Sequence, residues 1–169
     1  MSVVTVVGHP RADSRTQTVA IAAGEAIAAR LGGPVAHELV DLSALGPHLL
    51  APAASPGVEA ALGLVAEASV LLVAGPTYKG TYTGLLKAFL DRLPPAALAG
   101  RSALPLLVMG DPKHSLAVEV HLRPLLVELG ASVPTPGLAF LESQLPDLRE
   151  VVAAWAEQVV PQLPARVPH

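Results

Sequence analysis

Cationic and hydroxyl side chains gather in a short loop near the start of the chain. Arg11 and Arg15 lie there beside the hydroxyl residues Ser14 and Thr16, directly before a segment with helical apolar spacing. Guanidinium groups, hydroxyl groups and the free N–H groups of a helix start together form a site for an anion such as phosphate. The same spacing also fits a plain helix start, in which Asp13 or Ser14 caps the helix and the arginines lie in solvent.

A second polar loop, residues 75–84, follows the apolar run 70–73. Its glycines let the backbone approach a ligand closely, and its threonine hydroxyls suit the polar edge of a flat ring. A plain connection between a strand and a helix fits the same residues. The loop contains Pro76, Thr77, Tyr78, Lys79, Gly80 and Thr81.

A third loop begins at Gly110, after the apolar run 102–109. We expect it to wall the same crevice, because the carboxyl ends of neighbouring parallel strands lie at one edge of a sheet. His114 in this loop either touches a ligand or caps the helix that follows. His9 lies beside the proposed anion site, where a single histidine need not titrate in function.

Other chemistries find little support in the sequence. The first loop matches neither a Gly-x-Gly-x-x-Gly dinucleotide fingerprint nor a P-loop, and no Gly-x-Ser-x-Gly elbow is present. The chain contains no cysteine, which excludes a thiolate nucleophile or a thiolate metal site. The histidines show no spacing typical of metal ligands, and no carboxylate pair suggests a hydrolase.

Strand-length apolar runs alternate with helical patterns along the chain and position these loops. Such alternation indicates a mainly parallel sheet with helices on both faces. We predict an α/β fold with a flavodoxin-like, doubly wound, five-stranded parallel sheet of order 2-1-3-4-5, in three α/β/α layers. In that order the first and second polar loops meet where the chain reverses direction. The expected strands span residues 3–7, 35–42, 70–74, 102–109 and 133–141, and the expected helices 18–31, 58–68, 85–93, 115–129 and 146–163.

Prolines interrupt several of these elements. Pro105 lies within the fourth strand, which is unusual for a buried position. Pro124 lies inside the helix 115–129, where it removes the bond to the Val120 carbonyl and predicts a kink or a local π-bulge. The Pro- and Gly-rich segment 43–57 is either a lid or rim loop or an irregular connection.

Composition sets limits on location and partners. With 169 residues, 51% of them hydrophobic and 15% charged, the chain suits a single domain over 1–169. A net charge of −3 gives no reason to expect nucleic acid, and the apolar runs are too short to span a membrane. The first residues indicate a strand rather than a signal peptide, so we expect a cytoplasmic protein.

Three motifs carry a resemblance to a known family. The chain resembles the NAD(P)H-dependent FMN reductases, and within them the flavin-reductase components of alkanesulfonate monooxygenase systems. The motifs are Gly8-x-Pro10-Arg11-x-x-Ser14-Arg15-Thr16, then Pro76-Thr77-Tyr78-Lys79-Gly80-Thr81-Tyr82-Thr83-Gly84-x-Leu86-Lys87-x-x-Leu90-Asp91, and then His114-x-Leu116-Ala117-Val118 with Leu122-Arg123-Pro124.

The resemblance implies a role for each loop. It implies that Arg11, Ser14, Arg15 and Thr16 hold the phosphate of FMN, and that residues 76–81 contact the isoalloxazine and ribityl parts. It also implies that the helix 85–93 and the helix containing Pro124 help to build a homodimer or homotetramer. Two departures from the family pattern stand in the site. His9 replaces a usual serine, and Asp111-Pro112 stands where a second glycine is common.

The activity implied by the resemblance is hydride transfer from NADPH or NADH to FMN, with reduced flavin passed to a partner flavin-dependent monooxygenase. A quinone or azo reductase with bound FMN would share the first half of that reaction. A flavodoxin-like electron carrier is the alternative outside enzymes, although the modest net charge of −3 argues against it. A relative that has lost flavin binding is a further alternative, given His9 and Asp111.

Overall fold

The computed structural model describes residues 1–164, and the last five residues of the predicted domain 1–169 lie outside them. One five-stranded sheet runs through the described residues in the order β2-β1-β3-β4-β5, and every neighbouring pair is parallel. The predicted flavodoxin-like topology is therefore confirmed. The strands are β1 (Ser2–Val7), β2 (Ala36–Asp41), β3 (Val70–Pro76), β4 (Ser102–Met109) and β5 (Leu138–Leu141).

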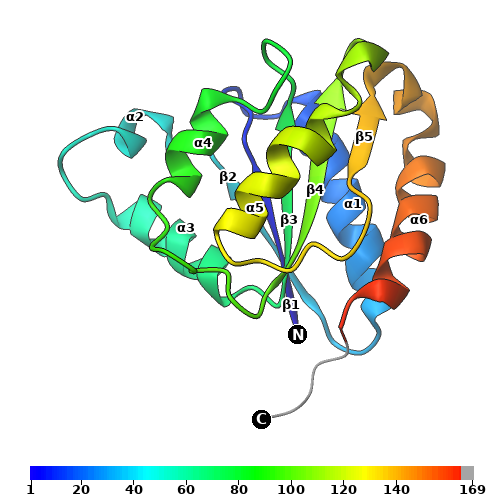
Figure 1. Ribbon diagram of the computed structural model, residues 1–169, viewed down its shortest axis with the longest axis horizontal. Coiled ribbons are helices and arrows are strands. Elements are labelled where there is room, and N and C mark those ends of the chain that lie inside the picture. Colours follow the sequence, from blue (N-terminus) through cyan, green and yellow to red (C-terminus); the bar gives the residue numbers. More distant parts are fainter. Residues whose placement is uncertain (165–169) are drawn as a thin grey trace.

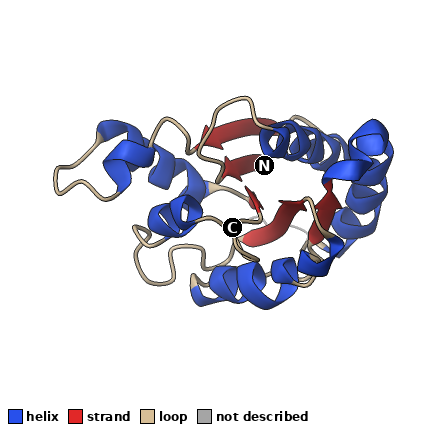
Figure 2. Cartoon of the chain, turned by 90° about the horizontal axis from the view of Figure 1, so that it is seen from above, coloured by secondary structure: helices blue, strands red, loops and turns tan. Residues whose placement is uncertain are grey.

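Helices cover both faces of this sheet (Figures 1 and 2). Side chains of α1 and α6 pack on one face, and side chains of α3, α4 and α5 pack on the other. The three-layer architecture is confirmed. The helices are α1 (Arg15–Leu31), α2 (Gly46–Leu49), α3 (Pro56–Glu67), α4 (Gly84–Leu90), α5 (Arg123–Glu128) and α6 (Leu148–Val159), with 3₁₀ turns at Pro112–His114, Glu142–Asp147 and Val160–Gln162 and a π-helical turn at Val118–Leu122.

The central strands are apolar because both of their faces are covered. Every residue of β3 and of β4 is buried, whereas β2 at the edge of the sheet keeps several exposed side chains. A strand buried on both sides is a continuous apolar run rather than an alternating one, which is why the sequence pattern located β3 and β4 so well. The Pro- and Gly-rich segment 43–57 contains the short α2 and the first two residues of α3.

Pro105 fits in β4 because no residue of β5 pairs with it, so its lack of an N–H group costs no hydrogen bond between strands. The Ala103 N–H donates to the Ser132 carbonyl at 2.8 Å, whereas pairing with β5 begins only at Leu106 and Leu138. Alternate residues of a strand point their N–H groups to the same side, so Pro105 lies where the chain 133–137 has left the sheet. The predicted strand 133–141 is therefore wrong over its first five residues.

The predicted helix 115–129 is broken in the way that Pro124 suggested. Residues Val118–Leu122 form a π-helical turn, in which the Arg123 N–H donates to the Val118 carbonyl, and Pro124 then lies in the first turn of α5. Arg123 donates to the Val133 and Thr135 carbonyls, while Glu119 accepts from the Gly137 N–H. The turn thus holds the non-strand segment that replaces the start of β5.

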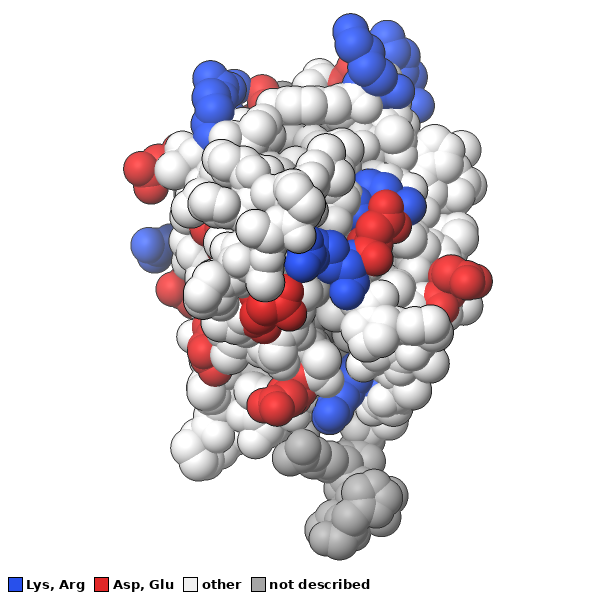
Figure 3. Space-filling model, turned by 90° about the vertical axis from the view of Figure 1, so that its left-hand side faces the viewer, with Lys and Arg blue, Asp and Glu red and all other residues white. Residues whose placement is uncertain are grey.

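All strands point toward the same edge of the molecule, at the top of Figure 1, where their following loops gather. The side that carries α2, α3 and α4 appears in Figure 3, and acidic and basic side chains are interspersed over it. This mixed distribution agrees with the low charged fraction of 15% and the net charge of −3.

Candidate functional site

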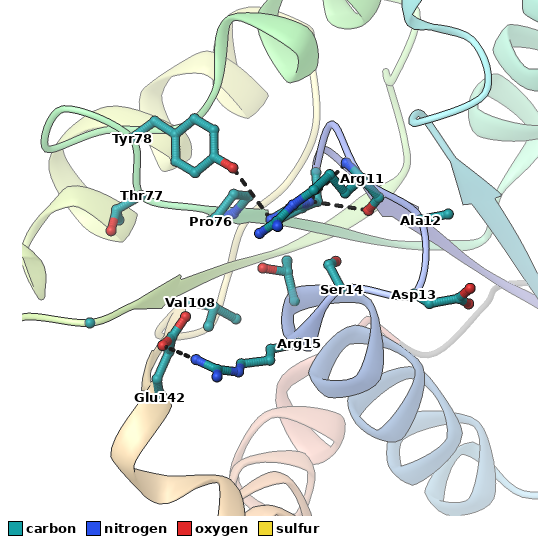
Figure 4. A pocket seen from close by; sticks show the side chains of 13 residues that line it. Arg11, Ala12, Asp13, Ser14, Arg15, Pro76, Thr77, Tyr78, Val108 and Glu142 are labelled. Carbon is teal, nitrogen blue, oxygen red and sulfur yellow. Dashed lines mark hydrogen bonds and ion pairs between the residues drawn. The ribbon is translucent and has the colours of Figure 1, made fainter.

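A cavity of about 500 Å³ opens at the carboxyl edge of the sheet, between the loops that follow β1 and β3. Figure 4 shows side chains from both loops, from the end of β4 and from the turn after β5 around it. The reversal of strand order between β1 and β3 is where ligands bind in open α/β sheets. The lining residues are His9, Arg11, Ala12, Asp13, Ser14, Arg15, Thr16, Pro76, Thr77, Tyr78, Val108, Gly110 and Glu142.

Ser14 caps the start of α1 and lines the cavity as well. Its backbone is extended (φ −74°, ψ 159°), and its hydroxyl oxygen accepts a hydrogen bond from the Gln17 N–H at 3.2 Å. The next two amides, of Arg15 and Thr16, are at the first helical positions and find no carbonyl within the helix. Capping leaves the Ser14 hydroxyl proton free to donate, so the helix start presents several donors to an anion.

The two arginines of this loop differ in what they contact. Both are exposed at the cavity wall, and Arg15 forms an ion pair with Glu142, Nη1 to Oε2, at 2.7 Å (Figure 4). Glu142 is the first residue after β5, so it reaches the same edge of the sheet. Sequence reasoning missed it, although its place directly behind a predicted strand was the signal that would have found it.

The loop after β3 is a tight turn made by backbone groups. The Tyr78 N–H donates to the Thr81 carbonyl at 2.8 Å, and Lys79 and Gly80 both have positive φ angles, 53° and 83°. Two successive positive φ angles define a type I′ turn. Pro76, Thr77 and Tyr78 line the cavity, whereas Lys79, Gly80 and Thr81 form the turn and lie outside the lining.

His9 connects the two loops. It is buried, its Nδ1 accepts from the Arg11 N–H at 3.0 Å, and its Nε2 lies 3.4 Å from the Tyr78 hydroxyl. Burial lowers the pKa of His9 below 6.5, and the nearby Arg11 charge lowers this pKa further against an opposing hydrogen bond to the Arg11 backbone. The neutral ring satisfies its contacts with the proton on either nitrogen. On Nε2 the proton is donated to Tyr78 while Nδ1 accepts from Arg11, and on Nδ1 it is donated to the Arg11 carbonyl at 3.1 Å while Nε2 accepts from the Tyr78 hydroxyl.

Gly8 and Thr83 hold the two loops at a fixed separation. The Thr83 hydroxyl donates to the Gly8 carbonyl at 2.6 Å and accepts from the Leu86 N–H at 3.1 Å, which caps α4. A Cβ atom on Gly8 would lie 2.7 Å from the Leu86 Cβ, so only glycine permits this approach. The loops after β1 and β3, which form two walls of the cavity, are therefore linked directly to each other.

A model of the NADPH-dependent FMN reductase family matches residues 1–145 of the chain. The chain belongs to this family. The FMN reductase (NADPH) of Escherichia coli strain K12 is 36% identical over 147 residues, which are 87% of this chain and 76% of that protein. The NADH-dependent FMN reductase SfnF of Pseudomonas putida is 34% identical, over 80% of this chain and 75% of its own length.

The fold agrees with the family assignment. The apo crystal structure of the NADH:FMN oxidoreductase EMOB superposes with a TM-score of 0.87 at 32% identity, covering 98% of this chain and 91% of that one. The resemblance noted from the sequence motifs is thereby confirmed as family membership.

The residues of this family member fit FMN. A phosphate needs several donors and positive charge, which the start of α1 and the two arginines present together. A flat ring needs an open wall near backbone groups, which Pro76, Thr77 and Gly110 provide. Both kinds of surface face one cavity, as a ligand with a ring and a phosphate tail requires.

The third loop contributes less to the cavity than its neighbours do. Gly110 lines it, but the Asp111 carboxylate turns to Lys113, with which it forms an ion pair at 2.8 Å. Hydrogen bonds from Lys113 lower the pKa of Asp111, so the carboxylate stays charged and engaged outside the lining. His114 also lies outside the lining, against the turn, with its Cδ2 4.0 Å from where a Gly80 Cβ would be.

Within residues 1–164, no group of three or more His, Asp or Glu side chains is placed to hold a metal ion. No helix in these residues combines the length and the hydropathy that crossing a lipid bilayer requires.

Proposed function

We propose that this chain reduces FMN with NADPH or NADH as the electron donor. The observation that carries this proposal is the meeting of an anion-binding helix start and a backbone turn around one cavity at the switch point of the sheet. Membership in the FMN reductase family supports the same chemistry. FMN, when bound, supplies the ability to accept hydride from a nicotinamide and to pass the electrons on.

The loop after β1 is the proposed phosphate site. Arg11 and Arg15 supply positive charge and forked donors, while Ser14 and Thr16 supply hydroxyl protons beside the free amides of the helix start. Thr16 is 2% exposed and Ser14 9%, so these donors are held in place before a ligand arrives. Donors held in this way lose little freedom when the phosphate binds.

The loop after β3 is the proposed ring site. Pro76, Thr77 and Tyr78 form its wall, and Tyr78 is 44% exposed, which leaves the open side of the ring accessible to a nicotinamide. We assign Lys79, Gly80 and Thr81 to the outer edge of the ring and ribityl chain, because their turn continues this wall. Gly110 closes the opposite side, and His114 supports the turn from behind.

We propose that the chain forms one flavin-binding domain, lies in the cytoplasm and passes reduced FMN to a flavin-dependent monooxygenase. Relatives named for NADPH and for NADH both match the chain, so both donors belong in any assay. An open cavity rather than a closed one suits a flavin that must leave in reduced form.

We also propose that the chain works as a homodimer or homotetramer. Three large apolar side chains of the π-helical turn and its flanking residues are exposed, with Leu116 at 68%, Val120 at 56% and Val127 at 54%. A row of apolar groups on one helical segment favours contact with a second copy. Size-exclusion chromatography with light scattering measures the mass, and Val120→Glu is expected to shift it toward the monomer.

The proposed function is tested by flavin binding followed by turnover. The purified protein is expected to bind added FMN and to oxidise NADPH or NADH when free FMN is the acceptor. The same assay is run with a quinone as acceptor and with no acceptor. Absence of FMN binding would refute the proposal, and binding without nicotinamide oxidation would identify an electron carrier instead.

The phosphate assignment has a separate test. Riboflavin lacks the phosphate, so Arg15→Ala is expected to weaken FMN binding about tenfold while changing riboflavin binding little. Equal weakening of both flavins would reject the assigned role of Arg15.

A further inference from the structure

A carboxylate occupies Arg15 in the proposed phosphate site. Glu142 Oε2 lies 2.7 Å from Arg15 Nη1, and both residues line the cavity. The two are 127 positions apart in the sequence, and only the order of the sheet brings the end of β5 to the start of α1. Figure 4 shows the Arg15 side chain directed to Glu142.

The charges that line the cavity cancel. Arg11 and Arg15 are its cationic side chains, and Asp13 and Glu142 are carboxylates, while burial keeps His9 neutral. A site for a phosphate dianion with this balance binds its ligand through local donors rather than through net positive charge. Such a site is expected to hold FMN more weakly than the same loop without its carboxylates.

The contact of Glu142 with Arg15 is easy to exchange for another. The two side chains are 42% and 67% exposed, and ion pairs exposed to this degree contribute little to stability. Phosphate oxygens offer the same forked guanidinium a partner of higher charge. The Glu142 carboxylate is thus an anion like the FMN phosphate and accepts from the same Arg15 guanidinium.

We propose that Glu142 is an internal competitor for Arg15 that sets how tightly the phosphate of FMN is held. The inference rests on the proposed function and deepens it, since it concerns a flavin that must be released. Glu142 pairs with Arg15 when the phosphate leaves and gives way when it arrives. The carboxylate therefore lowers the affinity for FMN and narrows the preference for FMN over riboflavin.

The test compares two variants that remove one carboxylate charge each. Glu142→Gln removes the competitor, whereas Glu59→Gln breaks the exposed Arg92–Glu59 pair at 3.1 Å, outside the cavity lining. Dissociation constants for oxidised FMN and riboflavin are measured by flavin fluorescence, without any nicotinamide. Glu142→Gln is expected to tighten FMN binding about threefold to tenfold and to leave riboflavin unchanged, with the gain shrinking at high salt. Glu59→Gln is expected to change neither constant.

Each outcome decides the inference. Weaker FMN binding in Glu142→Gln would overturn it, because the carboxylate would then hold Arg15 in place for the phosphate. An equal gain for both flavins would overturn it as well. If the wild-type protein binds FMN but Glu142→Gln has the same ratio of FMN to riboflavin affinity as wild type, only the proposed role of Glu142 fails. If the wild-type protein binds no FMN, the proposed function itself fails.

Inorganic phosphate gives a readout that does not depend on the ring. Phosphate is expected to displace FMN but not riboflavin. Its inhibition constant against FMN is expected to be several-fold lower for Glu142→Gln than for wild type or for Glu59→Gln. A phosphate effect that is the same for all three proteins would contradict competition at Arg15.

Discussion

The loop after β1 and the loop after β3 border one cavity but present different chemistry to it. The first offers charged and hydroxyl side chains, held by a helix cap and by the buried His9. The second offers backbone groups in a turn whose tip, Lys79 and Gly80, has positive φ angles and packs little. The charged end of a ligand would therefore meet a fixed wall of the cavity, and its ring would meet an open one.

The fixed wall and the open wall are joined at Gly8 and Thr83. Hydrogen bonds and close packing at this joint set the width of the cavity, whereas the turn beyond it depends on a single pair of residues, Tyr78 and Thr81. Substitutions at Gly8 or Thr83 are therefore expected to lower the free energy of unfolding of the whole domain. Substitutions in the turn are expected to have only local effects.

Gly8→Ala is expected to have the largest effect. The new Cβ would lie 2.7 Å from the Leu86 Cβ, so the loop or α4 must move, and overpacking of this kind lowers the free energy of unfolding by about 2–3 kcal/mol. Urea denaturation measures it. Gly63→Ala is the control, because its Cβ meets nothing within 4 Å in α3 and helix propensity predicts a gain of about 0.5–1 kcal/mol. Similar values for the two variants would show that the joint is not tightly packed.

Thr83→Val is expected to come next. Valine keeps the shape of threonine but removes the cap of α4 and the bond to the Gly8 carbonyl, in a residue that is 2% exposed. The loss of both bonds lowers the free energy of unfolding by about 2 kcal/mol. Thr83→Ser keeps the hydroxyl and is expected to lose less than half as much in the same denaturation experiment. A Thr83→Val protein as stable as wild type would separate the two loops energetically.

Sequence reasoning predicted where the two loops lie but not the contacts of Gly8 and Thr83 that join them. The apolar runs and their order placed both loops at the switch point, because strands such as β3 and β4 that are buried on both faces leave a continuous apolar signal. The resemblance then identified most of the lining residues. These signals come from residues that are close together in the sequence, so they can be recognised from the sequence alone.

Contacts between distant positions were not predicted. Glu142 reaches Arg15 only because β5 ends beside β4, and His9 meets Tyr78 across 69 positions. No spacing rule connects such residues, since their proximity depends on sheet order and strand length together. The early part of the predicted strand 133–141 failed for a related reason, because residues 133–137 do not pair with β4 and Gly137 instead packs against Pro105.

The pH dependence of stability is a smaller effect that belongs to the fixed wall. Burial lowers the folded-state pKa of His9 below its ordinary 6.5, so the unfolded chain binds more protons. The contribution of His9 to the free energy of unfolding is therefore expected to be fully present above pH 6.5 and to be lost as the pH drops from 6.5 toward the folded-state pKa of His9. Urea denaturation of flavin-free protein between pH 5 and pH 8 measures this slope.

His9→Asn is expected to reduce this slope without removing it. Burial also lowers the pKa of His37, which bonds to Thr5 between β1 and β2, so His37 adds a slope of the same sign. Tyr78→Phe is the control, because it removes the partner hydroxyl and leaves the buried imidazole in place. An unchanged slope in His9→Asn would show that the first loop does not keep His9 neutral.

The turn is expected to give the smallest effect, and one of opposite sign. Lys79 has a φ of 53°, a conformation that asparagine adopts more readily than lysine, so Lys79→Asn is expected to raise the free energy of unfolding by about 0.5 kcal/mol. Asp13 in the first loop has the same φ of 53° but already belongs to the residue types that tolerate it, so Asp13→Asn is expected to change stability by less. Urea denaturation compares the two variants directly. A larger gain at Asp13 than at Lys79 would place the strain in the wall that we describe as fixed, and would reverse the contrast between the two loops.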